Sequence, residues 1–239
     1  MLNRLKTPTK RYKYLLLFAL LMPVCNTFSQ SSLNQTGAWY MYFYAVEFKE
    51  SPWGVQGDVQ YRNWNIGGDL EQLLLRSGLT YKPKGTGIKF TLGAANITSG
   101  TPGESTDTSG ETRIYQEALL PQKLGGRFYL THRFRYEQRF VDDQDFRTRY
   151  RYNLFLNVPL NNKEFTKNTF YIALYNELFV NGQTAIGDNR EVALFDRNRT
   201  YLGTGFVISP KTKVQFGWMN QKTNALGKAQ WQVSLHTSF

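Results

Sequence analysis

Long runs of alternating apolar and polar residues dominate the chain after residue 36. In residues 132–140, HRFRYEQRF, aromatic residues alternate with arginine and glutamate, and residues 88–94, IKFTLGA, alternate in the same way. Successive side chains of a β-strand point to opposite faces, so each run predicts a strand with one apolar and one polar face. Because almost no segment shows helical periodicity, the pattern predicts an all-β fold.

Segments rich in Gly, Pro, Asn, Asp and Lys separate eleven runs of this kind, as turns between strands do. The predicted strands cover residues 37–47, 53–64, 70–82, 87–98, 111–120, 126–140, 146–159, 168–181, 191–208, 212–222 and 228–239. An average strand of a soluble protein has about five or six residues, whereas a tilted strand that crosses a bilayer needs about 9–11. Strand length therefore favours a single antiparallel transmembrane β-barrel over a soluble sandwich or barrel.

The number of strands is constrained by a second rule. Single-chain bacterial barrels have an even number of strands, and the runs number eleven. Twelve strands are expected, which requires one long run such as 191–208 to form two strands, and ten are the alternative. The two longest breaks, 99–110 and 182–190, fall at the same end of the predicted barrel, as extracellular loops do.

The first 29 residues have the parts of a secretory signal peptide. Residues 1–13 carry five positive charges, residues 14–24 form an apolar run, and Thr27 and Ser29 are small residues at positions −3 and −1 of a cleavage site. The apolar run is too short for a membrane helix, which needs about 20 residues. Cleavage near Ser29 is therefore expected.

Composition agrees with a secreted chain that enters the bacterial outer membrane as one domain, residues 30–239. Cys25 is the single cysteine and lies in the predicted leader, so the mature chain has no disulfide. Lipid attachment at Cys25 is an alternative that the preceding Pro23-Val24 fits poorly. Aromatic residues make up 15% of the chain and gather near strand ends, as aromatic girdles do. The mean hydropathy of −0.47 does not exclude a barrel, because alternation averages out its apolar face.

The net charge of +11 raises nucleic acid as a partner. The basic residues are spread along the predicted strands instead of forming one tail or helix, so no nucleic-acid partner is expected. Outer-membrane lipids and the barrel-insertion machinery are the expected partners, and other outer-membrane proteins are a further candidate.

The polar faces of the predicted strands would line the barrel lumen. This face carries eleven arginines and three glutamates: Arg62, Arg76, Arg113, Glu117, Arg133, Arg135, Glu137, Arg139, Arg147, Arg149, Arg151, Glu177, Arg197 and Arg199. In one interpretation these side chains fill a narrow lumen and each glutamate has arginine partners, because unpaired buried charges are costly. In the other, the surplus of arginine makes a narrow anion-preferring channel.

An outer-membrane lipid-modifying enzyme with a Ser/His acyl-transfer site is a weaker alternative. The chain has two histidines, His132 and His236. His132 shares the parity of the apolar face, whereas His236 lies on the lumen parity between Ser234 and Ser238. A histidine flanked by serines is too common to identify a nucleophile and a base, so no catalytic residue is predicted.

No cofactor or metal is expected. The aspartates at positions 142, 143 and 145 could suggest calcium, but they lack the glycine and the distal glutamate of a calcium loop. These aspartates are therefore expected to lie in a solvated turn.

The last predicted strand ends on a phenylalanine. Trp231, Val233, Leu235 and Phe239 share one parity and are expected to face lipid. Such an ending resembles the C-terminal signal by which outer-membrane barrels are recognised for insertion. An ordinary last strand of a secreted sandwich is the alternative.

A series of motifs carries a family resemblance along nearly the whole mature chain. The most specific are HRFRYEQRF (132–140), RYRYNL (149–154), YNELF (175–179) and NRTYLG (198–203). With them the chain resembles the domain-of-unknown-function family 2490, predicted outer-membrane barrels of Gram-negative bacteria. The resemblance implies a barrel and leaves the activity open. The expected function is a structural or interaction component with a largely filled interior.

Overall fold

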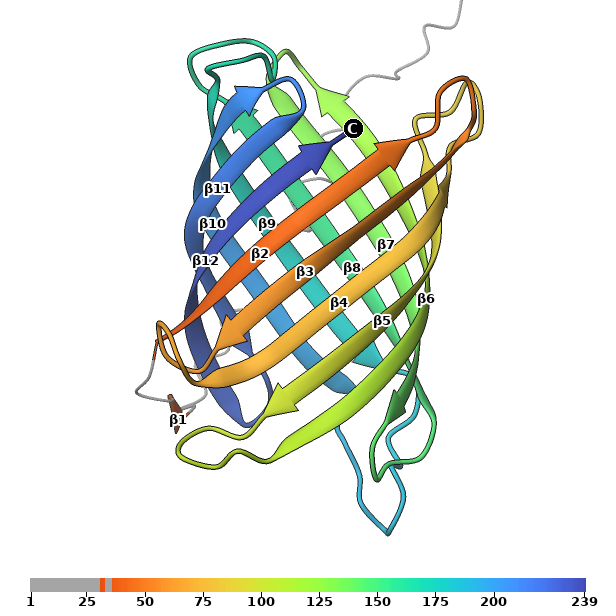
Figure 1. The fold of residues 1–239 in the computed structure, drawn as a ribbon, viewed down its shortest axis with the longest axis vertical. Helices are drawn as coiled ribbons and strands as arrows, with labels where there is room; N and C mark the ends of the chain where they lie inside the picture. Colours follow the sequence, from red (N-terminus) through yellow and green to blue (C-terminus); the bar gives the residue numbers. More distant parts are fainter. Residues whose placement is uncertain (1–30, 33–35) are drawn as a thin grey trace, which may run out of the picture. The chain divides into compact units, whose positions relative to one another are not determined.

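The computed structural model describes residues 31–32 and 36–239, which fold into strands and connecting turns (Figure 1). The predicted signal peptide, residues 1–29, lies outside the described residues. The strands are β1 (Ser31–Ser32), β2 (Gly37–Glu47), β3 (Trp53–Asn63), β4 (Leu70–Tyr81), β5 (Lys89–Gly100), β6 (Thr108–Leu124), β7 (Phe128–Val141), β8 (Arg147–Pro159), β9 (Phe170–Asn181), β10 (Phe195–Ser209), β11 (Thr212–Lys222) and β12 (Leu226–Ser238). Within these residues the structure contains no helix, and so none long and apolar enough to cross a membrane.

The strands β2 to β12 form a closed barrel in which sequence neighbours pair antiparallel. Closure comes from β12 and β2, which pair in parallel from Gln230 opposite Gly37 to Ser238 opposite Ala45. The short β1 pairs in parallel with the start of β12, below β2 (Figure 1). The all-β barrel is thus confirmed.

The expected strand number of twelve, or ten, is corrected by this closure. Over the described residues the barrel wall has eleven long strands, one for each alternating run. The run 191–208 forms one strand, β10, which begins only at Phe195. An odd number of alternating strands places the first and last side by side in the same direction, so a parallel pair closes the barrel.

The longest connection, residues 182–194, and the connection 101–107 lie at the end of the barrel opposite the C-terminus. Residues 101–107 join β5 to β6, and residues 182–194 join β9 to β10. The C-terminal end carries the connections 48–52, 82–88, 125–127, 160–169 and 210–211, of which 160–169 is the longest. Both long breaks of the sequence therefore fall at one end, as expected.

The outer surface of the barrel is apolar and its interior is charged. On β7, Phe134 and Phe140 are about half exposed, whereas Glu137 between them is 1% exposed. On β12, Trp231, Val233 and Leu235 face outward and are exposed. This distribution is the reverse of a soluble protein, which keeps large apolar side chains inside.

Aromatic rings pair across neighbouring strands on this outer surface. Phe134 lies 5.0 Å from Tyr152, and Tyr136 lies 5.1 Å from Tyr150, between ring centroids on β7 and β8. Cross-strand aromatic pairs of this kind stabilise the register of a sheet.

Glycines on β10 make room for tyrosine rings inside the barrel. The ring of Tyr171 lies directly over Gly205, and that of Tyr201 lies over Gly203, so a Cβ atom at either glycine would overlap a ring. Tyr171 and Tyr201 belong to an apolar cluster with Trp39 on this side of the interior. The interior therefore holds an apolar cluster beside its charged side chains.

Candidate functional site

The inward-facing arginines and carboxylates of β3 to β10 form a set of ion pairs, here called the lumen network. Glu137 lies at its centre. Its Oε2 accepts hydrogen bonds from Nε and Nη2 of Arg149, at 2.9 and 2.7 Å. Its Oε1 accepts one from Nη1 of Arg151 at 2.5 Å, and Arg135 and Arg113 approach it at 3.7 and 3.9 Å. Four guanidinium groups around one carboxylate compensate its removal from water.

The other two predicted glutamates are held in the same way. Oε1 of Glu177 accepts hydrogen bonds from Arg151, at 2.5 and 2.9 Å, and from Nη2 of Arg133 at 2.6 Å. Oε2 of Glu117 accepts from Nε and Nη2 of Arg135 at 2.7 and 2.5 Å. Each predicted glutamate therefore has arginine partners, and shared arginines join the three carboxylates into one network.

Two further carboxylates belong to the network and could have been found from the alternation. Asp58 has the parity of Arg62 on β3, and its carboxylate pairs with Arg76 at 2.9 Å. Glu111 has the parity of Arg113 on β6 and pairs with it at 2.6 Å. Both sequence positions lie on the lumen face once the register of the strand is known.

Two more carboxylates lie inside because the strands are irregular where they occur. Asp196 sits at a register shift between Phe195 and Arg197 and accepts a hydrogen bond from Arg149 at 2.7 Å. Glu71 sits at a shift between β3 and β4 and pairs with Lys228 at 2.9 Å. A bulge moves a side chain to the other face, so simple alternation could not place these residues.

All fourteen charged residues predicted for the lumen face the interior, and most of them are buried. Among the described residues, Arg62, Arg147 and Arg199 have no carboxylate within 4.0 Å. Arg62 and Arg199 instead lie over the indole ring of Trp39, at 3.7 and 4.9 Å from its centroid. Cation–π contact and stacking suit the flat guanidinium group. The interior therefore keeps a surplus of positive charge.

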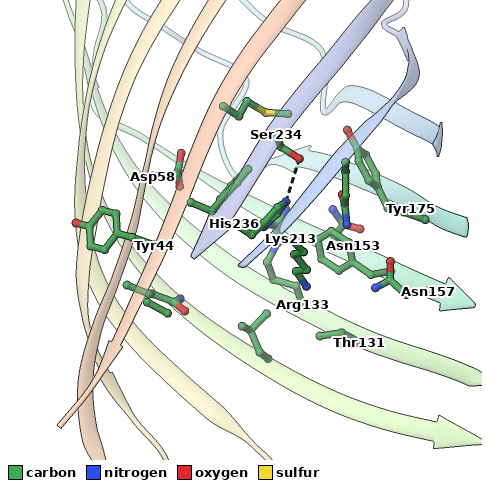
Figure 2. A pocket seen from close by; sticks show the side chains of 18 of the residues that line it. Tyr44, Asp58, Thr131, Arg133, Asn153, Asn157, Tyr175, Lys213, Ser234 and His236 are labelled. Atoms are coloured by element: carbon green, nitrogen blue, oxygen red, sulfur yellow. Dashed lines mark hydrogen bonds between the residues drawn. The ribbon is translucent and has the colours of Figure 1, made fainter. Parts of the chain in front are cut away.

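A cavity of about 580 Å³ lies above the network, in the half of the barrel nearest the C-terminus. The turn at Pro210 and Lys211 lines its outer end, and Glu117, Arg151 and Glu177 line its floor. Nine basic side chains line it against three acidic ones. Figure 2 shows this hollow with Arg133 and Lys213 among its lining residues. The lumen is filled by ion pairs below and hollow above.

A Ser–His pair lies on the wall of the cavity. The hydroxyl of Ser234 and Nε2 of His236 are 2.9 Å apart, drawn as the dashed line in Figure 2. The imidazole ring stacks on Phe43, with centroids 4.6 Å apart and planes at 9°. Among the described residues no carboxylate bonds to this imidazole. The pair therefore lacks the third group that orients the base of a hydrolytic triad.

The remaining candidates lie outside the lumen. His132 is on the outer surface, where Nδ1 lies 2.9 Å from the hydroxyl of Tyr152. Asp142 lies in the turn after β7, and its carboxylate accepts a hydrogen bond from the backbone N–H of Gly110 on β6 at 2.6 Å. No cluster of three metal-ligating side chains occurs in the part of the chain that the structure describes.

The fold and its interior define a class, closed β-barrels with an ion-paired lumen and an apolar outer surface. Within it, the chain belongs to the family described as "Protein of unknown function (DUF2490)", whose model matches residues 36–232. The family resemblance read from the sequence motifs is thereby confirmed. No curated protein and no solved structure matched the chain.

Proposed function

We propose that this protein is an outer-membrane β-barrel whose lumen is closed by the lumen network and which serves as a structural or interaction component. The observation that carries the proposal is the inverted distribution of polarity. Large apolar side chains cover the outside of the strands, whereas charged side chains fill the inside. A transmembrane barrel has this arrangement because lipid surrounds its outer surface. Polar side chains find hydrogen-bond and ion-pair partners only inside the barrel.

The connections support one orientation of the barrel. Outer-membrane barrels have short periplasmic turns and longer extracellular loops. The turns at 125–127 and 210–211 lie at the C-terminal end, and the longest connection, 182–194, lies at the other. We assign the C-terminal end to the periplasm, so the cavity opens on that side. Outer-membrane lipids and the barrel-insertion machinery are then the partners of the outer surface, and other outer-membrane proteins are candidates.

Location is tested by fractionating cells that express the full chain. The protein is expected in the outer-membrane fraction of a density gradient, and its gel mobility should change on heating. Recovery of a folded protein from the periplasm without detergent would overturn the proposal and favour a secreted sandwich or barrel.

A narrow anion-preferring channel is the second candidate, and the surplus of basic residues around the cavity favours it. Rings of arginine and lysine select anions. In the closed-lumen proposal, the ion pairs below the cavity block the passage of ions. These pairs join Glu137 to arginines on β8.

Planar-bilayer recording separates the two. The native barrel should show no stable conductance. The triple variant Arg113→Ser, Glu137→Ser and Arg149→Ser should conduct. Its current would also show that the barrel inserts into the bilayer. A stable anion-selective current through the native barrel would replace the closed lumen with the channel.

A lipid-modifying enzyme has little support in this interior. The Ser234–His236 pair has no carboxylate partner among the described residues, and a base of this kind needs an orienting group. The enzyme hypothesis would be supported if the native protein hydrolysed lipid and His236→Ala abolished that activity. The variant must still show heat-modifiable gel mobility, as a folded barrel does.

A further inference from the structure

We infer that the cavity at the C-terminal end is a binding site for an amphiphilic anion, a molecule with one anionic headgroup and one apolar chain. The inference does not depend on the cellular location of the barrel and goes beyond a structural role. It rests on two surfaces of opposite chemistry that meet inside one hollow, and on basic groups there that have no carboxylate partner.

The basic surface offers charge that the lumen network does not use. Lys89, Lys211 and Lys213 line the cavity, and none of them lies within 4.0 Å of a carboxylate of the described residues. Lys213 is mostly buried and stands on β11 opposite His236. Arg133 and Arg135 also line the cavity and add positive charge beside these lysines. An anionic headgroup supplies the charged acceptor that the three lysines lack.

The apolar surface is continuous with the basic one. The ring of Phe155 lies 5.8 Å from that of Tyr175, which stacks on Tyr201 at 4.9 Å. Phe165, from the connection 160–169, packs edge-on against Tyr171 at 5.1 Å and adds to the same wall. These rings form an aromatic surface along which an apolar chain can lie.

The two surfaces meet at one arginine. The guanidinium of Arg133 lies 5.2 Å over the ring of Phe155. A ligand whose headgroup reaches Arg133 therefore has its chain beside the aromatic wall. The cavity volume of about 580 Å³ falls within the roughly 300–1,000 Å³ of sites that enclose small molecules.

A free anion or a neutral amphiphile matches only half of this site. Inorganic phosphate would meet the basic groups and leave the aromatic wall uncovered. A neutral chain would cover the wall and leave the three lysines without a charged acceptor. Both are therefore expected to bind more weakly than an amphiphilic anion.

Native mass spectrometry of the mature barrel released from a non-ionic detergent tests the inference. Decanoate and decyl phosphate are the probes, with inorganic phosphate and decanol as matched half-ligands. At least one of the two probes should bind as one copy per barrel. The half-ligands should need about tenfold higher concentration, as the loss of a charge-assisted hydrogen bond or of chain burial predicts.

Two variants locate the bound molecule. Lys213→Gln and Phe155→Ala should each weaken probe binding by about tenfold. Their controls are Lys222→Gln, an exposed lysine at the other end of β11, and Phe134→Ala, an exposed ring on the outer surface. Neither control should change binding.

Three results would overturn the inference. The first is that neither probe binds to a barrel whose gel mobility still shifts on heating. The second is that phosphate or decanol binds as tightly as the probes. The third is that the control variants reduce binding as much as Lys213→Gln, which would assign the bound probe to the outer surface.

Discussion

Glu137 and Arg149 face each other across β7 and β8 and are joined by two hydrogen bonds, from Nε and Nη2 of the arginine to Oε2 of the glutamate. The two residues are 12 positions apart in sequence and both are buried. Paired, charge-assisted hydrogen bonds of this kind stabilise charged groups that are buried away from water. The interior of this barrel is built from such pairs, so its stability should depend on single carboxylates.

Replacing Glu137 with alanine should destabilise the barrel strongly. The substitution leaves the guanidinium groups of Arg149 and Arg151 buried without this acceptor, and loss of one partner of a buried pair costs about 3–5 kcal/mol. The free energy of unfolding in urea, measured in detergent micelles, should fall by that amount. Glu104→Ala, in the exposed connection 101–107, should change it little. Equal effects of the two variants would refute a stabilising role for the network.

An arginine on the outer surface should impair membrane insertion. Leu202 lies mid-strand on β10 and is 61% exposed, and Leu194 is 60% exposed in the connection before that strand. Arginine at the bilayer midplane costs about 2–4 kcal/mol and little near the interface. Leu202→Arg should therefore lower the yield of heat-modifiable barrel in lipid vesicles, whereas Leu194→Arg should fold normally. The same yield for both would mean that β10 does not face lipid.

Gly205→Ala should strain the aromatic wall. A methyl group at this position overlaps the ring of Tyr171, and overpacking of an interior costs about 1–3 kcal/mol. The thermal midpoint of unfolding should drop, and removing the ring with Tyr171→Ala in the same chain should make the added methyl harmless. Gly126→Ala, in a turn with open space around it, is the control. Additive losses in the double variant would show that the ring is not the obstacle.

Processing should remove residues 1–29. The mass of the protein purified from the outer membrane should correspond to a chain that begins at Gln30, because Thr27 and Ser29 are the small residues that the peptidase requires. Ser29→Arg should block cleavage, and Ser32→Arg, three positions downstream, should not. A mature mass that still includes the leader would contradict this prediction.

Phe239 should contribute to insertion more than to stability. It is 63% exposed, so its removal leaves no cavity. Phe239→Ala is expected to reduce the amount of barrel in the outer membrane of cells while the refolded protein keeps its urea midpoint. Phe48→Ala, an exposed ring in the turn after β2, serves as the control. Unchanged amounts in cells would remove Phe239 from the proposed insertion signal.

Much of this architecture follows from local sequence. Alternation places each side chain on one of two faces, because successive residues of a strand point in opposite directions. Arg133, Arg135 and Glu137 could therefore be assigned to one face and Phe134 and Tyr136 to the other without any structure. The eleven runs also gave the strand positions to within a few residues at most ends.

The tertiary structure decided what alternation cannot describe. Closure depends on how all the strands meet, and an odd number produces the parallel β12–β2 pair. Register shifts bring Asp196 and Glu71 to the interior against simple parity. The partner of each carboxylate depends on which strands are neighbours, as for Arg133 and Glu177, which lie 44 residues apart in sequence. The cavity is lined by side chains from strands that are far apart in sequence, such as Arg133 on β7 and Lys213 on β11. Local pattern thus determines the face on which a charge lies, and packing across the closed barrel determines which charges meet.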